Sequence, residues 1–224
     1  MFLRILNPFW AREEFKRLSE EKKNWLIPIG ILLLIIILAI IAGQIINPKL
    51  QPVVNEYLSR SMDPQQLETV EKFSKISNVI GIVIIVITVF LGWLLKSVLI
   101  HTISSFLGGA TVKFKDSLNL MGYTYLPIIF HKIFGIYQAV NFEPPKTYEE
   151  LIALTKEQTM SLLGFVKNYA NIWILWSIFL VVMLLKSHYK LSTRKALSVA
   201  LICYIIIWGL TLAWIYISKS LIPG

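Results

Sequence analysis

Apolar residues gather in five long runs, which are separated by shorter polar segments. A helix needs roughly 20 apolar residues to cross a bilayer core of about 30 Å, and the runs are close to that length. Because backbone groups inside lipid must be hydrogen-bonded within the chain, each run predicts a helix. None of the runs alternates between apolar and polar residues with period two, as the strands of a membrane barrel do. The predicted spans are residues 25–46, 79–107, 123–140, 170–185 and 196–217.

The pattern therefore predicts an all-α fold, a polytopic transmembrane helical bundle of five spans. Residues 1–24 form the leader, residues 25–218 the five-span membrane domain, and residues 219–224 a short tail. The first run is longer than the roughly 7–15 residues of a signal peptide's apolar region, and no A-x-A cleavage site follows it. We therefore expect the first run to be retained as a span.

The polar segments carry start signals for short amphipathic helices. Asn7 and Pro8 open the leader as a cap residue followed by proline, and aromatic residues then alternate with bases and acids. Two interpretations fit the leader: a helix in the headgroup zone of the bilayer, or a helix packed on the protein's own loops. Further start signals begin at Asp63 and at Thr147, which Glu150 follows three residues later. We expect short interfacial helices at these places, and we expect the helix that begins at Asp63 to run directly into the second span.

Composition supports a membrane protein, because 56% of the residues are hydrophobic and only 16% are charged, against about 45–50% and 25% in soluble domains. The formal net charge of +9 indicates basic flanks that face anionic lipid, and not a nucleic-acid partner. Lys and Arg are more frequent on the leader's side of the predicted spans, and residues 186–195 carry no acid. The sequence therefore predicts a cytoplasmic N-terminus and a C-terminus on the outside.

The candidate chemistry is sparse. All 13 acidic residues lie outside the five runs, which argues against most ion-coupled transport schemes. No catalytic serine triad, glycine-rich phosphate loop or H-E-x-x-H helix is present. One cysteine, Cys203, and three separated histidines do not make a zinc cluster. We therefore expect no enzyme activity, no catalytic residues, no cofactor and no metal.

Four basic side chains lie inside the runs: Lys96 and His101 in the second run, and His131 and Lys132 in the third. Lys96 is near the end of the second run, and we expect it to snorkel to the interface, with a role in an ion path as the alternative. His131 and Lys132 follow Pro127 in the third run, where a central lysine costs about 2.5–3.5 kcal/mol. Two interpretations stay open for this pair: a polar cavity, or a proline kink whose polar groups are satisfied locally.

A compact motif links the second and third runs. Its members are Gly108, Gly109, Phe114, Lys115, Asn119, Gly122, Tyr123 and Pro127. Paired glycines favour a tight turn, and Lys113 and Lys115 are placed to face lipid phosphates. Gly122 and Tyr123 are expected to set an aromatic ring at the interface, with Pro127 bending the helix beneath it.

This motif resembles the signature of the Yip family, the "Yip-one" domain of five-span, Ypt/Rab-interacting membrane proteins. The resemblance implies five spans, an amphipathic cytoplasmic leader and an outward C-terminus. The leader lacks the D-L-[YF]-G-P element and the long soluble extension of many trafficking members. The chain therefore resembles the compact prokaryotic branch, which implies a prokaryotic cell membrane and does not imply Rab binding.

These observations predict a non-enzymatic integral membrane protein that organises membranes or binds partners. Its expected partners are the lipid bilayer, other membrane proteins or further copies of itself, and not nucleic acid. The alternative is a pathway for small solutes or lipids, lined by polar side chains of the third span and its neighbours. Those side chains are His131, Lys132, Gln138, Asn141 and Asn171.

Overall fold

The computed structural model describes the chain except residues 1, 22–23, 161–163, 165, 168–169 and 222–224. The part of the chain that the structure describes is helical and contains no strand, which confirms the all-α class. The helices are α1 (Phe2–Leu6), α2 (Ala11–Glu20), α3 (Leu26–Ser61), α4 (Pro64–Phe106), α5 (Phe114–Tyr123), α6 (Leu126–Val140), α7 (Tyr148–Met160), α9 (Ile172–His188) and α10 (Thr193–Leu221). The predicted tail falls partly on residues 222–224, which lie outside the described residues.

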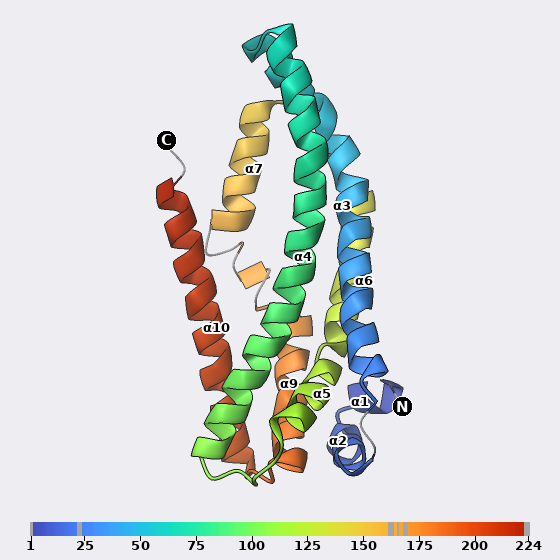
Figure 1. Ribbon diagram of the computed structural model, residues 1–224, viewed down its shortest axis with the longest axis vertical. Helices are drawn as coiled ribbons and strands as arrows, with labels where there is room; N and C mark the ends of the chain where they lie inside the picture. Colours follow the sequence, from blue (N-terminus) through green and yellow to red (C-terminus); the bar gives the residue numbers. More distant parts are fainter. Residues whose placement is uncertain (1, 22–23, 161–163, 165, 168–169, 222–224) are drawn as a thin grey trace.

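The helices run up and down along one long axis (Figure 1). α3 leads away from α1 and α2, α4 returns, and α5 and α6 together lead away again. α7 and α9 return in the same way, and α10 leads away to the end opposite α2. We call the end that holds α1 and α2 the leader end, and the opposite end the far end.

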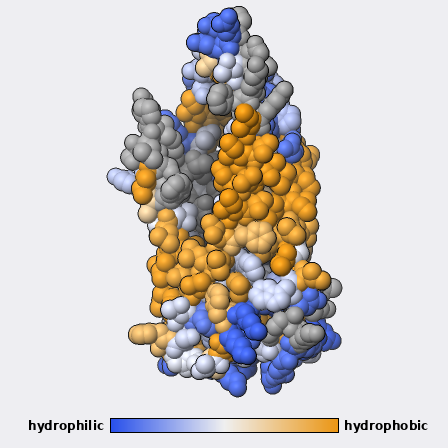
Figure 2. Space-filling view, in the orientation of Figure 1, coloured by the Kyte–Doolittle hydropathy of each residue, from blue (hydrophilic) through white to orange (hydrophobic). Residues whose placement is uncertain are grey.

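Apolar side chains cover the middle of the bundle, and hydrophilic side chains gather at both ends (Figure 2). On α4 the exposed apolar side chains recur every three or four residues along one face. They include Val79, Ile80, Val83, Ile84, Ile87 and Leu91. Soluble monomers rarely expose so large an apolar surface, whereas lipid tails match it. Within the described residues, three helical segments are long and apolar enough to cross a membrane: 26–61, 76–106 and 193–213.

The third crossing is made of two helices. α5 and α6 are separated at residues 124–125, and Pro127 lies in the first turn of α6, where its missing N–H needs no partner. Pro127 therefore helps to begin a helix and does not kink one. The predicted span began at Tyr123, whereas the structure extends this crossing back to Phe114. Residues 114–122 look too polar for a span, but Ser117 and Asn119 are buried against protein.

The fourth crossing is also divided, with α7 in the far half and α9 in the leader half (Figure 1). Its predicted span of 170–185 corresponds to α9, a helix of 17 residues. Asn171 begins α9 as a cap, because its Oδ1 accepts from the N–H groups of Trp173 (3.1 Å) and Ile174 (3.2 Å). The segment with Thr147 and Glu150 is therefore a helix inside the bundle, in contact with α3 and α10.

The most completely buried side chains lie in the leader half. They include Leu120, Met121, Leu180, Val181, Leu184 and Leu185. Lipid tails are as apolar as leucine, so the hydrophobic effect does not drive these helices together within the bilayer. Close van der Waals packing and hydrogen bonds between helices hold such a core together. The well-packed half is thus the one that carries the motif between α4 and α6.

Among the residues that the structure describes, the leader packs on the protein's own helices and not on its loops. α2 contacts α9 and α5, and buries Phe15, Leu18 and Glu14, the last paired with Arg17. Phe9 and Trp10 stay outside this contact, with 87% and 50% of their surfaces exposed. The leader therefore includes a docked helix, α2, that two exposed aromatic side chains precede, and Arg4 lies over the ring of one of them, Trp10.

Two predicted start signals are confirmed. Asp63 accepts from the N–H groups of Gln65 (3.0 Å) and Gln66 (2.9 Å), and the Gln66 side chain accepts from the Asp63 N–H, which completes a capping box. At the start of α7, the Glu150 N–H donates to the Thr147 hydroxyl at 3.2 Å.

Lys49 fastens α3 to the end of α6. Its ammonium donates to the carbonyl oxygens of Ala139 (3.1 Å), Val140 (2.5 Å) and Phe142 (3.0 Å). These carbonyls lie at the C-terminus of α6, where a helix lacks its own donors and the dipole favours a cation. One side chain thus closes the far end of the third crossing.

We expect Lys49→Met to lower the free energy of unfolding by about 1–3 kcal/mol, because it removes the ammonium that donates to the carbonyls of Ala139, Val140 and Phe142. Chemical denaturation of the purified protein in detergent, followed by circular dichroism, measures this change. Lys146→Met is the matched control, since Lys146 is exposed at the same end. Equal stability of the two variants would contradict the role of Lys49 as a cap.

Candidate functional site at the leader end

The paired glycines form the turn between α4 and α5. Gly108 has φ of +79°, in the left-handed region that side chains other than glycine rarely adopt. A Cβ atom on Gly109 would lie 2.8 Å from the carbonyl oxygen of Ser104 and 3.4 Å from the Cβ of Tyr189. A side chain is therefore disfavoured at Gly108 by the backbone conformation and at Gly109 by steric clash.

This turn is bonded to the turn between α9 and α10. The Ala110 N–H donates to the carbonyl of Tyr189 at 2.8 Å. The Lys195 ammonium donates to the carbonyl of Leu107 at 2.9 Å. The ends of α4 and α9 and the start of α10 are thus held as one unit at the leader end.

A buried polar cluster lies directly above the two turns. The Tyr189 hydroxyl donates to Ser117 Oγ at 2.7 Å and lies 2.9 Å from His101 Nδ1. His188 Nε2 lies 3.5 Å from the same Ser117 oxygen, and the Phe114 ring packs edge-on against His101 at 5.3 Å. The cluster joins α4, α5 and α9, and it explains the phenylalanine of the motif as a packing partner.

Sequence reasoning missed this cluster because its members are far apart in the chain. His101 and His188 are separated by 87 positions and share no motif, and Ser117 and Tyr189 carried no signal. Burial raises the pKa of Tyr189 to about 12, and its bond to Ser117 opposes this in part. The hydroxyl therefore stays protonated, as a hydrogen-bond donor, at physiological pH.

We expect Tyr189→Phe to lower the free energy of unfolding by about 1–2 kcal/mol at pH 7, since it removes the donor to a buried hydroxyl. The raised pKa of Tyr189 also makes the stability difference between wild type and Tyr189→Phe depend on pH. The folded state holds this proton more tightly than the unfolded chain, so its contribution is complete below about pH 10 and is lost as the pH rises towards 12. Denaturation curves measured from pH 8 to about pH 11.5 should show the free energies of unfolding of the two proteins converging as the pH rises. A constant difference across that range would contradict this assignment.

The second half of the motif packs the start of the first crossing. A Cβ on Gly122 would lie 2.3 Å from the Cβ of Pro28, so only glycine allows α5 and α3 to approach this closely. Asn119 donates through Nδ2 to the carbonyl of Asn24 at 3.3 Å. The Trp93 indole donates to the carbonyl of Leu118 at 3.0 Å, which adds α4 to the same contact.

Tyr123 closes α5 and is buried against protein, with 2% of its surface exposed. The leader's Arg17 and Glu21 act electrostatically on its hydroxyl, so the side chain lies within reach of the leader. Its placement at the membrane interface stays a prediction.

Lys96 is buried, with 5% of its surface exposed, and does not snorkel. Its ammonium donates to the hydroxyls of Thr124 (3.3 Å) and Ser177 (3.2 Å). It also lies over the rings of Tyr125 and Tyr204, 4.7 Å and 5.0 Å from their centroids. Among the described residues, no carboxylate forms an ion pair with it. Lys96 therefore joins four crossings through neutral partners.

The other predicted polar residues differ in burial and in role, and the polar cavity stays a prediction. His131 and Lys132 are half-buried on α6, while Gln138 and Asn141 are exposed. Asn171 caps α9, and its amide also donates to the carbonyl of Lys167 at 3.1 Å. Lys113 and Lys115, expected to face lipid, are both exposed at the leader end.

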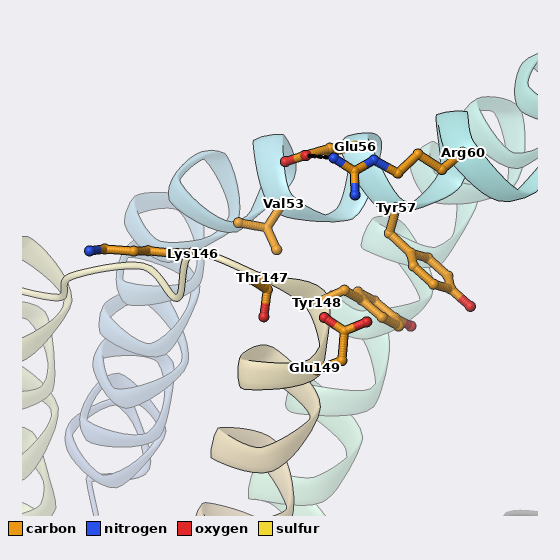
Figure 3. A pocket seen from close by; sticks show the side chains of 8 residues that line it. All are labelled: Val53, Glu56, Tyr57, Arg60, Lys146, Thr147, Tyr148 and Glu149. Carbon is orange, nitrogen blue, oxygen red and sulfur yellow. Dashed lines mark hydrogen bonds and ion pairs between the residues drawn. The ribbon is translucent and has the colours of Figure 1, made fainter.

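A pocket at the far end contains none of the predicted site residues. It lies between α3 and the start of α7, and its floor includes the stacked rings of Tyr57 and Tyr148, 3.9 Å apart (Figure 3). Arg60 pairs with Glu56 at 2.5 Å along one wall. These contacts fasten α3 to α7.

Comparison with known proteins gives a family for the whole arrangement. The Yip1 domain model matches residues 3–215, from the leader to the last helix. No curated protein and no solved structure matches the chain. The match includes every motif residue that packs the leader end, as well as the apolar helices around it. The chain belongs to the Yip1 domain family of integral membrane proteins.

Proposed function

We propose that this protein is a non-enzymatic membrane protein that organises the bilayer or binds partners through its leader end. The observation that carries the proposal is that two turns, the leader helix and the motif are fastened together there, with bases and aromatic rings exposed. A fixed surface of this kind suits recognition, because little ordering remains to be done on binding. The expected partners are other membrane proteins or a second copy of the chain.

The orientation belongs to the same proposal. The leader end faces the cytoplasm, the far end faces outside, and the protein crosses a prokaryotic cell membrane five times. The distribution of Lys and Arg supports this, since residues 186–195 carry four bases and no acid.

We also propose that the protein has no enzyme activity, because the polar side chains of its buried cluster are bonded to one another. Ser117, Tyr189 and His188 are buried and bonded to one another, so they stabilise packing and do not face a substrate. The Lys96 ammonium likewise donates its hydrogen bonds to the hydroxyls of Thr124 and Ser177.

Site-directed photo-crosslinking in native membranes tests the proposal. A photoreactive residue at Phe9 should give a discrete crosslinked species, whereas one at Tyr137, which is exposed on α6, should give only lipid adducts. Trp10→Ser should weaken the crosslink from Phe9 at unchanged protein level. No discrete species at Phe9, together with solute or lipid flux in proteoliposomes that depends on Lys132, would overturn the proposal in favour of a pathway.

A further inference from the structure

The two turns of the leader end carry charge of almost one sign. Residues 106–116 and 186–195 together hold six Lys and Arg residues and a single acid, Asp116. Five of the bases have exposed side chains, and we call the four of them other than Lys195 the basic rim. The basic rim consists of Lys113, Lys115, Lys190 and Arg194.

The basic rim is one surface because its two turns are fixed to each other. The bond from the Ala110 N–H to the Tyr189 carbonyl joins the residues just inside the rim. The ammonium of Lys195 is occupied by the Leu107 carbonyl, so it serves to join the turns. Lys190 has φ of +54°, a left-handed conformation that belongs to the turn itself. The charges are therefore held in place by backbone geometry.

An exposed aromatic ring adjoins the basic rim. Phe106 ends α4, immediately before the turn, and is 87% exposed. An isolated phenylalanine gains nothing from water or from a free phosphate ion, but it is stabilised where acyl chains meet headgroups. Phe9, between α1 and α2 at the same end, is equally exposed.

We propose that the basic rim binds the phosphate headgroups of anionic phospholipids, with Phe106 inserted beside their acyl chains. The inference deepens the proposed function, and it rests on it only for the statement that the leader end lies at a membrane surface. The arrangement of bases at the hydrophilic end and of apolar side chains directly above it matches the order of phosphate and acyl chain in a bilayer (Figure 2). Each base close to an anionic surface contributes roughly fivefold to affinity.

Lipid co-purification from mixed nanodiscs tests this inference. The full chain is placed in phosphatidylcholine that contains a minor share of phosphatidylglycerol, re-extracted in detergent, and its retained lipids are quantified by mass spectrometry. The rim variant combines Lys113→Gln, Lys115→Gln and Arg194→Gln and leaves Lys190, whose backbone is in the left-handed region. The matched control removes three exposed lysines away from the leader-end turns, with Lys146→Gln, Lys156→Gln and Lys167→Gln.

Wild type and control should retain phosphatidylglycerol in excess over its share of the nanodisc. The rim variant should lose that enrichment by at least about fivefold, and Phe106→Ser should reduce it without changing the charge. Far-ultraviolet circular dichroism and gel filtration confirm that each variant is folded. Equal enrichment in wild type and rim variant would overturn the inference.

The outcomes also separate this inference from the proposed function. If the rim variant keeps its lipids but loses the crosslink at Phe9, the bases recognise an acidic protein, and the lipid inference is wrong while partner binding stands. If lipid enrichment depends on the basic rim but wild type gives no crosslink, partner binding is wrong and the lipid inference stands.

Discussion

Replacing Gly122 by alanine is expected to lower the free energy of unfolding by about 3 kcal/mol, near the upper end of overpacking effects. The added Cβ would lie 2.3 Å from the Cβ of Pro28 and 3.1 Å from its Cα. Pro28 is part of α3 and cannot turn its ring away without moving the helix. The clash therefore separates α3 from α5, and it weakens the bond between Asn119 and the carbonyl of Asn24 in the same contact.

Gly135→Ala is the matched control for this substitution. Gly135 lies within α6, and a Cβ there would meet nothing within 4 Å. Alanine at this position should leave stability unchanged or raise it by roughly 0.5–1 kcal/mol, because it restricts the unfolded chain. Denaturation of both variants in the same detergent gives the comparison. If Gly122→Ala were as stable as Gly135→Ala, the close approach of α3 and α5 would be contradicted.

Lys96→Glu is expected to have a similarly large effect, a loss of about 3 kcal/mol or more. The substitution places a negative charge between the faces of Tyr125 and Tyr204, whose π-electrons attract the native cation and repel an anion. It also removes the donor to the hydroxyls of Thr124 and Ser177.

Lys96→Met should stay within about 1 kcal/mol of wild type, because a buried charge without a partner of opposite charge costs about as much as its contacts supply. The two hydroxyls keep their own acceptors in this variant. Ser177 still donates to the carbonyl of Thr124 at 2.7 Å, and Thr124 to that of Met121 at 2.7 Å. If Lys96→Met lost as much stability as Lys96→Glu, Lys96 would have an anionic partner, and the arrangement described above would be wrong.

Much of the fold could be predicted from the sequence because membrane helices are specified by local composition. The long apolar runs that became α3, α4 and α10 need only length and hydropathy. The start signal at Asp63 was equally readable, since a capping box involves only neighbours along the chain. The division of the third crossing was not readable, because the polar residues of α5 are satisfied by distant partners.

The part of the candidate site that depends only on backbone conformation could be predicted from the sequence. The turn at Gly108 and Gly109 follows from what glycine allows, and structure and sequence agree there. The contacts of Gly122 with Pro28 and of Tyr189 with Ser117 join residues whose separation in the chain carries no pattern. Lys96 was misplaced for a related reason: its depth along the run suggested an interface, and only packing revealed the surrounding hydroxyls and rings.

The most direct test of this account is a cysteine-accessibility measurement of its topology. Cys203 is the only cysteine of the chain and is buried, so Cys203→Ala provides a clean background. Single cysteines then replace Arg12 and Thr111 at the leader end, and Arg60 and Glu143 at the far end. Intact bacterial spheroplasts are treated with a membrane-impermeant maleimide, before and after permeabilisation.

The account predicts that cysteines at positions 60 and 143 react in intact spheroplasts, and that those at positions 12 and 111 react only after permeabilisation. Reaction of positions 60 and 143 from opposite sides would contradict the continuous third crossing by α5 and α6. Reaction of position 12 in intact spheroplasts would contradict the cytoplasmic orientation of the leader end.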